Sequence, residues 1–242
     1  MSVNLHDHIA LVTGASRGIG RSIGIALADA GAHVVLGARS KDKLESVRDE
    51  ISSRGGNATV AAVDVSSERE TIALFERISQ LFNRLDILVN NAGIGIWGKL
   101  VDFDIKDFDK LMSVNVRGMY LCCQRALKLM IPKKQGYIFN ISSVVGFKGY
   151  PKQSAYTATK HAVMGITKSL AVEAQEHNIC VSAILPGGVD TTFIGEARPD
   201  LDRSVLMPPE DIAHTILYLL SLSNRAWVDQ IHLRRRNGTP FI

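Results

Sequence analysis

Apolar residues along this chain fall into short runs that alternate with longer segments of helical period. The short runs are nearly continuous in apolar residues and lie at 8–14, 33–38, 59–65, 85–91, 136–142, 179–186 and 228–234. The helical segments lie at 19–30, 41–53, 68–82, 105–131, 155–177 and 209–222. Strands and helices in alternation predict βαβ crossovers, and therefore a parallel sheet with helices covering both faces.

The alternation of predicted strands and helices continues along residues 1–242 without a linker, so we expect one α/β domain. The exception is residues 187–208, which are rich in Gly, Pro, Asp and Thr and have no strong period. A long loop in a compact domain is usually functional. We therefore predict a loop that covers a ligand site at the carboxyl ends of the strands.

Composition and charge narrow the classes of function. The apolar share of 46% and the net charge of 28 − 24 = +4 describe an ordinary globular protein and do not indicate nucleic-acid binding. The basic run Leu233–Gly238 is predicted to be a solvated strand end or a subunit contact. Three cysteines, two of them adjacent, predict reduced thiols in a cytoplasmic protein. We recognise no signal peptide, membrane-spanning run or metal site.

A glycine-rich turn follows the first predicted strand and opens a helix. It reads TGASRGIG, Thr13–Gly20. Glycines at such a turn let the backbone approach a pyrophosphate, whose charge is favoured by the helix N-terminus. Tight packing alone would also explain glycines here, and the spacing departs from the G-x-G-x-x-G fingerprint of dinucleotide-binding folds.

The spacing of this turn resembles the short-chain dehydrogenase/reductase family, and five further motifs follow in the order that the family has. They are NNAG at 90–93, VNVRG at 114–118, NISSVVG at 140–146, YTATK at 156–160 and PGGVDT at 186–191. The resemblance covers residues 13–191 and includes members such as 3-oxoacyl reductases and carbonyl reductases. It implies a doubly wound Rossmann-type sheet of about seven strands in the order 3-2-1-4-5-6-7.

Charge at the end of the second predicted strand favours NADP(H). A site for NAD usually has a carboxylate there, whereas this chain has Arg39. Arg39 and Arg17 together are predicted to clamp a 2′-phosphate, the alternative being two solvated arginines. Asp64 resembles the family's residue that binds the adenine amino group; a plain strand-end or helix-capping carboxylate is the alternative.

The resemblance assigns cofactor contacts to residues from every part of this region. They are Gly14, Ser16, Arg17, Gly18, Ile19, Gly20, Arg39, Asp64, Val65, Asn91, Ala92, Gly93, Tyr156, Lys160, Pro186, Gly187, Val189 and Thr191.

Tyr156 and Lys160 are four residues apart, so they share one face of a helix. A phenol with a pKa of about 10 is an adequate proton donor. We expect the lysine charge, with the positive nicotinamide of the oxidised cofactor, to lower that pKa.

Ser143, thirteen residues before the tyrosine, is predicted to stabilise charge on a substrate carbonyl and is preferred to its neighbour Ser142. Asn115 matches the family's active-site asparagine, which holds a water in the proton path. A packed aromatic beside an exposed lysine is the alternative reading of the pair.

The predicted substrate side is mostly apolar. Its residues are Ile94, Trp97, Ser143, Val145, Phe147, Tyr150, Tyr156, Gly188 and Phe193. The predicted reaction is NADPH-dependent reduction of a ketone or aldehyde, with a small or aromatic ketone or a 3-oxoacyl thioester as substrate. Gln153 matches some 3-oxoacyl reductases, whereas the C-terminal segment departs from their glycine-rich ending.

The alternative function is a regulator of the same fold that binds NADP(H) without catalysis. Such a protein is expected to have lost the tyrosine or the lysine, and both are present. Nucleotide-sugar epimerases and dehydratases of the extended branch have longer chains and a differently spaced glycine loop. The long helices resemble those that form the family's dimer and tetramer contacts, so we expect a homo-oligomer.

Overall fold

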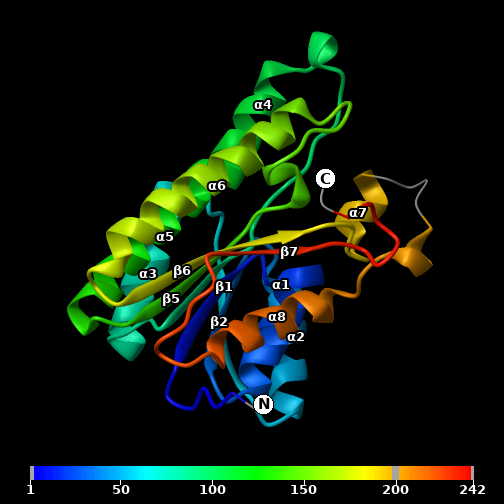
Figure 1. The fold of residues 1–242 in the computed structure, drawn as a ribbon. Helices are drawn as coiled ribbons and strands as arrows, with labels where there is room; N and C mark the ends of the chain where they lie inside the picture. The colour runs from blue at the N-terminus through cyan, green and yellow to red at the C-terminus, as the bar shows by residue number, and fades with distance from the viewer. Residues whose placement is uncertain (1–2, 198–201, 241–242) are drawn as a thin grey trace.

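In the computed structural model, which describes residues 3–197 and 202–240, seven parallel strands form one sheet. Their order is β3-β2-β1-β4-β5-β6-β7, as the resemblance implies (Figure 1). The strands are β1 (Ile9–Thr13), β2 (His33–Ala38), β3 (Asn57–Ala62), β4 (Ile87–Asn90), β5 (Gly136–Ile141), β6 (Ile179–Pro186) and β7 (Gln230–Leu233). The predicted doubly wound fold is therefore confirmed.

Helices cover both faces of the sheet. One layer contains α1 (Gly18–Asp29), α2 (Lys41–Ser53) and α8 (Pro209–Leu220), and the other contains α3 (Glu68–Phe82), α5 (Met119–Met130) and α6 (Ser154–Gln175). Within β1, the side chains of Ala10 and Val12 pack in the hydrophobic core under α1, α2 and α8. Those of Ile9 and Leu11 pack in the core under α3, α5 and α6. Because successive strand side chains point to opposite faces, a strand covered on both sides must be apolar throughout. No helix within the described ranges is long and apolar enough to span a membrane.

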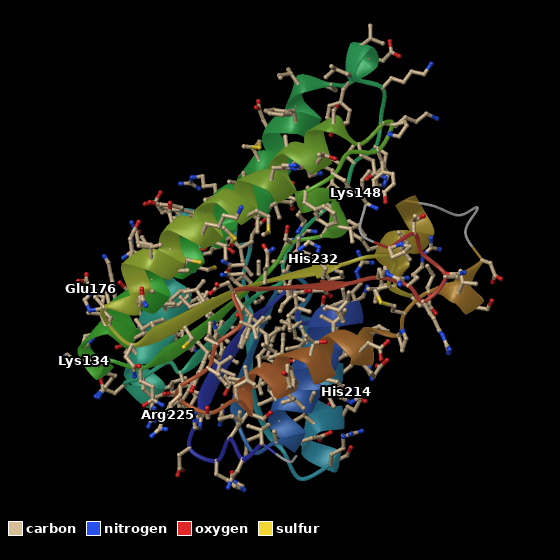
Figure 2. The ribbon with its side chains drawn as sticks, in the orientation of Figure 1. Lys134, Lys148, Glu176, His214, Arg225 and His232 are labelled. Carbon is tan, nitrogen blue, oxygen red and sulfur yellow. The ribbon has the colours of Figure 1, made fainter. Side chains whose placement is uncertain are left out.

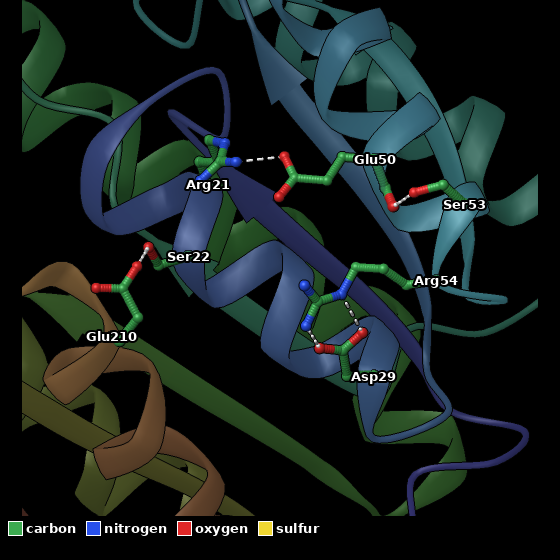
Figure 3. Close-up of polar contacts among 7 residues, drawn as sticks. All are labelled: Arg21, Ser22, Asp29, Glu50, Ser53, Arg54 and Glu210. Carbon is green, nitrogen blue, oxygen red and sulfur yellow. Dashed lines mark hydrogen bonds and ion pairs between the residues drawn. The ribbon is translucent and has the colours of Figure 1, made fainter.

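Helix α1 is held from both sides by polar contacts that Figure 3 shows. The contacts join Arg21 to Glu50 and Asp29 to Arg54 on the side of α2, and Ser22 to Glu210 on the side of α8. Ion pairs exposed to this degree contribute about 0.2–1 kcal/mol each. Their main consequence is orientation, since α1 continues directly from the glycine-rich turn.

The helix predicted at 105–131 is interrupted. It consists of α4 (Ile105–Met112), a π-helical segment η2 (Ser113–Gly118), α5 and the short turn η3 (Ile131–Lys133). A Cβ added to Gly118 would lie 3.0 Å from the backbone oxygen of Val65, so the wider turn passes close to the chain after β3. A π-helical segment is an uncommon local variant within α-helices, often at functional sites, and the helical period of residues 105–131 did not predict it.

The third strand ends earlier than predicted. β3 stops at Ala62, so Asp64 and Val65 lie in the turn that follows rather than at the strand's end. The Asp64 carboxylate accepts hydrogen bonds from the backbone nitrogen and the hydroxyl of Ser66, at 2.9 and 2.7 Å. This side-chain turn takes the chain out of the sheet.

The segment predicted as a continuous loop at 187–208 contains a helix, α7 (Thr192–Ala197), and the turn η5 (Arg203–Val205). Residues 198–201 of that prediction lie outside the described residues. A helix of less than two turns is too short to show a period. The two ends of the segment meet where Val189 pairs with Met207 and Asp190 forms an ion pair with Arg203 at 2.5 Å. Two further 3-10 turns are η1 (Leu100–Asp102) and η4 (Val144–Gly146).

Candidate active site

A cleft of about 590 Å³ lies at the carboxyl ends of the strands. It is lined by the segments that follow each strand from β1 to β7 and by the first turns of α6. All predicted site residues line it except Gly20, Asn115 and Phe147. Topology explains this convergence, because the carboxyl ends of parallel strands meet at one edge of the sheet.

The glycine-rich turn is fastened to the end of β4 by Thr13. The Thr13 hydroxyl accepts hydrogen bonds from the backbone nitrogens of Asn91 and Ala92, both at 3.1 Å, and donates to the oxygen of Val89 at 3.3 Å. In return, the Asn91 side-chain amide donates to the oxygens of Thr13 and Gly14, at 3.0 and 3.2 Å. The turn and the NNAG motif therefore form one rigid unit.

Close packing within this unit explains two of the glycines. Gly14 has φ +67°, and a Cβ there would lie 2.8 Å from the amide nitrogen of Asn91. A Cβ on Gly20 would lie 2.4 Å from the oxygen of Gly14. Gly20 therefore packs beneath the turn and is not among the residues that line the cleft, and its cofactor contact stays a prediction.

The end of the cleft beside β2 and β3 is basic. Arg17 and Arg39 line it, as predicted, and Ser40 and Lys43 at the start of α2 join them. Burial raises the pKa of the Asp64 carboxyl, but hydrogen bonds from Ser66 and the charge of Arg39 outweigh burial, so that pKa lies below its ordinary value. Asp64 is thus a charged carboxylate that both caps a turn and lines the cleft.

Tyr156 and Lys160 lie on the buried face of α6. The Lys160 ammonium donates a hydrogen bond to the backbone oxygen of Ile141 at 2.9 Å, and burial lowers its pKa to about 8. Burial also raises the pKa of the Tyr156 phenol well above its ordinary value, and a hydrogen bond with Ser143 lowers it only in part. Lys160 Nζ is 5.7 Å from the tyrosine ring centroid. The phenol is therefore protonated at neutral pH. The lowered phenol pKa expected from the sequence also depends on the positive nicotinamide of the oxidised cofactor and stays a prediction for that complex.

The two serines after β5 have different partners. The Ser142 hydroxyl is buried and donates to the backbone oxygen of Lys160 at 3.2 Å. The Ser143 hydroxyl accepts from the nitrogen of Val145 at 3.3 Å and contacts the oxygen of Pro186 at 3.5 Å. Ser142 is thus engaged with α6, while Ser143 is the serine beside the phenol.

Asn115 lies in the π-helical segment and makes three side-chain hydrogen bonds. Its amide oxygen accepts from the nitrogen of Ile94 at 2.8 Å, and its amide nitrogen donates to the oxygen of Ile94 and the hydroxyl of Thr159, at 2.9 and 3.2 Å. These bonds fix the chain after β4 against α6. The role of Asn115 in holding a water stays a prediction.

Aromatic rings form the wall of the cleft next to the phenol. Trp97 packs edge-on against Tyr156 with ring centroids 4.9 Å apart, and Phe193 of α7 lies 5.9 Å from each of them. Phe147 points elsewhere, is 42% exposed and packs against His232 of β7. Of the predicted substrate-side residues, Phe147 is therefore the one that does not line the cleft.

Sequence reasoning missed several residues that line the cleft. They are Ala38, Ser40, Lys43, Val63, Val114, Ile141, Val144, Thr192, Ile194 and Arg235. Lys43 could have been found, since it lies in the first turn of the helix that begins two residues after Arg39. Arg235 belongs to the basic run that was predicted as a solvated strand end or subunit contact, and its side chain lines the cleft. Among the described residues, no group of three or more His, Cys, Asp or Glu side chains is arranged to bind a metal.

Comparison with known proteins agrees with the motifs. The family model described as short chain dehydrogenase matches residues 8–202. An uncharacterised oxidoreductase of Staphylococcus aureus is 36% identical over 230 residues, which cover 95% of this chain and 98% of that protein. The 3-oxoacyl-(acyl-carrier-protein) reductase of Aquifex aeolicus is 35% identical, with all of both chains covered. A crystal structure of a metagenomic short-chain oxidoreductase in complex with NADP has a TM-score of 0.85 and 34% identity, covering 97% of this chain and 99% of that one.

The contacts of Thr13 generate a prediction about stability. Thr13→Val keeps the shape of the side chain but leaves the backbone N–H groups of Asn91 and Ala92 without their acceptor. We expect the free energy of unfolding, measured by urea denaturation, to fall by about 1–3 kcal/mol. Thr13→Ser keeps the hydroxyl and serves as the control. A Thr13→Val variant as stable as the wild type, with the loss confined to Thr13→Ser, would show that the methyl group, not the hydroxyl, fastens the turn.

Proposed function

Because the chain belongs to the short-chain dehydrogenase family, we propose that it is an NADP(H)-dependent oxidoreductase that reduces a ketone or aldehyde to an alcohol and also runs the reverse reaction. The observation that carries this proposal is the grouping of Ser143, Tyr156 and Lys160 beside an aromatic wall in the cleft. A small or aromatic ketone and a 3-oxoacyl thioester are the proposed substrates.

The residues of the cleft fit NADP(H). The glycine-rich turn lines the cleft with Gly14, Ser16 and Gly18, and it stands at the N-terminus of the twelve-residue helix α1. Arg17, Arg39 and Lys43 offer cations for a 2′-phosphate, and β2 ends without a carboxylate. NADP bound to the metagenomic relative supports the same choice. We propose the cofactor contacts predicted above, with Gly20 acting from beneath the turn.

The cofactor, when bound, supplies the hydride that the carbonyl carbon gains. The protein supplies the proton, which the Tyr156 phenol donates to the carbonyl oxygen. Ser143 donates a hydrogen bond to that oxygen and stabilises its developing charge. Lys160, held by Ile141, keeps a positive charge near the phenol as it becomes a phenolate. Asn115 fixes the backbone on which these groups stand.

The proposed arrangement of the chain is a single domain in which the segment 187–208 covers the ligand. Its helix α7 brings Phe193 to Trp97 and Tyr156, which supports a role in closing the substrate side. We also propose a cytoplasmic homo-oligomer, a dimer or a tetramer. A non-catalytic regulator is the rival, and tight NADPH binding without turnover of any ketone, diketone or 3-oxoacyl thioester would favour it.

Removing the phenol hydroxyl tests the proton donor. Tyr156→Phe should lower kcat by at least about 100-fold, because a positioned general acid contributes roughly 10²–10⁴. NADPH affinity, measured by fluorescence titration, should stay near the wild-type value. Tyr137→Phe makes the same chemical change at the start of β5, outside the cleft, and is the control. Turnover retained in Tyr156→Phe would refute the mechanism.

Reversing the charge at the end of β2 tests the cofactor. Arg39→Asp should reduce the preference for NADPH over NADH in kcat/KM by about 10- to 100-fold, since a hydrogen bond between charged groups contributes about 1.5–3 kcal/mol. Arg48→Asp changes the charge equally outside the cleft and should leave the preference intact. An unchanged preference in Arg39→Asp would exclude the proposed clamp.

Lys160 predicts how carbonyl reduction depends on pH. Its pKa is lowered from 10.5 to about 8, so the charged form is present below pH 8 and is lost as pH rises through that value. The phenol, with a raised pKa, remains a proton donor throughout this range. We expect kcat/KM for reduction to be level from pH 6 to about 7.5 and to fall above about 8. NADPH affinity measured at each pH is the control, and a level profile to pH 9.5 would contradict the assignment.

A further inference from the structure

The basic run after β7 reaches the cleft from the edge of the sheet. Leu233 pairs with Pro186, and its backbone oxygen accepts a hydrogen bond from Gly187 at 2.7 Å. The chain therefore leaves β7 alongside the segment that follows β6. Beyond that point the side chain of Arg235 runs over Gly188, where an added Cβ would lie 3.1 Å from the arginine Cδ and 3.5 Å from Nε. The absence of a side chain on Gly188 lets Arg235 line the cleft.

The Arg235 guanidinium has no carboxylate partner among the described residues. The carboxylate of the adjacent segment, Asp190, is paired with Arg203 at 2.5 Å. Arg234 turns back and donates three hydrogen bonds to the oxygens of the terminal turn, one of them on Arg235 itself. Arg235 is half-buried, and a cation withdrawn from water without a partner is costly. An anion that enters the cleft would offset that cost.

The place of Arg235 in the sheet separates it from the cofactor's phosphate clamp. Five steps between neighbouring strands lead from β2, which carries Arg39, to β7, and at about 4.8 Å a step this is roughly 24 Å. Only two steps, about 10 Å, separate β7 from β5, after which Ser143 lies. Arg235 is therefore on the side of the reacting carbonyl.

Neighbouring contacts support the same placement. Phe147, on the loop after β5, packs against His232 of β7 with ring centroids 4.5 Å apart, and Lys148 lies 5.2 Å from the ring of Tyr150. Figure 2 labels Lys148 and His232 in this region. Tyr150 lines the cleft. Asp64, at the far end beside β3, is the one carboxylate among the residues lining the cleft in the described ranges.

We propose that Arg235 binds an oxyanion on the substrate, so that the carbonyl compound reduced here carries a carboxylate or a phosphate ester. This inference rests on the proposed reduction of a carbonyl and names its substrate class. A guanidinium pairs with either oxyanion through two parallel hydrogen bonds. The aromatic wall holds the carbon chain between the carbonyl, at Ser143 and Tyr156, and the anion, at Arg235.

Matched pairs of substrates test the charge. Acetoacetate is compared with methyl acetoacetate, and dihydroxyacetone phosphate with dihydroxyacetone, in NADPH oxidation followed by absorbance. The wild type should prefer the charged member of at least one pair, and the preferred pair identifies carboxylate or phosphate as the source of the anion. Arg235→Gln should lower that preference by about 10- to 100-fold, mainly through KM. Arg235→Lys keeps the positive charge but loses the paired N–H donors of the guanidinium. This variant should retain part of the preference for the charged substrate.

Arg236→Gln is the matched control, because it removes the same charge from an exposed neighbour that does not line the cleft. Its preference should equal that of the wild type. NADPH affinity, measured by fluorescence titration, should be the same in all variants. A weakened affinity confined to Arg235→Gln would assign this residue to the cofactor and overturn the inference.

A second measurement separates this inference from the proposed function. Binding of each compound to the complex with oxidised NADP is measured by calorimetry, where no reduction takes place. Arg235-dependent binding of the anion without turnover would sustain the anion site and refute the reductase. Turnover of charged and neutral compounds alike, unaffected by Arg235→Gln, would refute the anion site and sustain the reductase. Neither turnover nor Arg235-dependent binding would refute both.

Discussion

The hydroxyl of Thr13 joins the two halves of the sheet at the place where the site forms. β1 leads to β2 and β3 on one side, while β4 begins the run to β7 on the other, so the crevice opens between the ends of β1 and β4. Thr13 spans that gap because its hydroxyl accepts hydrogen bonds from the backbone nitrogens of Asn91 and Ala92. The glycine-rich turn is thus oriented relative to the chain that carries Asn115 and the aromatic wall.

Burial then sets the chemistry of the groups placed there. Tyr156 and Lys160 are each less than a tenth exposed, and the same loss of water raises the pKa of the phenol and lowers that of the ammonium. Both changes favour the uncharged forms. A protonated phenol next to an ammonium held by the oxygen of Ile141 is a proton donor in its resting state. The spacing of the motif predicted the proton donor, but it carries no measure of burial and therefore did not predict this effect of desolvation.

The fold was predictable because covered strands must be apolar on both faces, and this pattern recovered β2, β6, α2 and α3 with their observed bounds. Features governed by hydrogen bonds were not predictable from periodicity. The turn at Asp64 ends β3 early, and the π-helical segment around Asn115 interrupts the helix predicted at 105–131. Site residues inside motifs were found, whereas residues such as Lys43 and Arg235 belong to no motif and reach the cleft through tertiary structure.

The cofactor and catalytic residues of the cleft therefore belong to different kinds of segment from the residues of the substrate side. The glycine turn and the NNAG motif follow directly from β1 and β4, and α6 is a regular helix, so their positions follow from the sheet. The substrate side instead depends on α7 and the chain after β7, which are short and joined to the sheet by few contacts, such as that between Gly187 and Leu233. Rigid elements hold groups more accurately than loops do. Hence the reaction class can be argued from motifs, whereas the substrate has to be argued from the placement of single side chains such as Phe193 and Arg235.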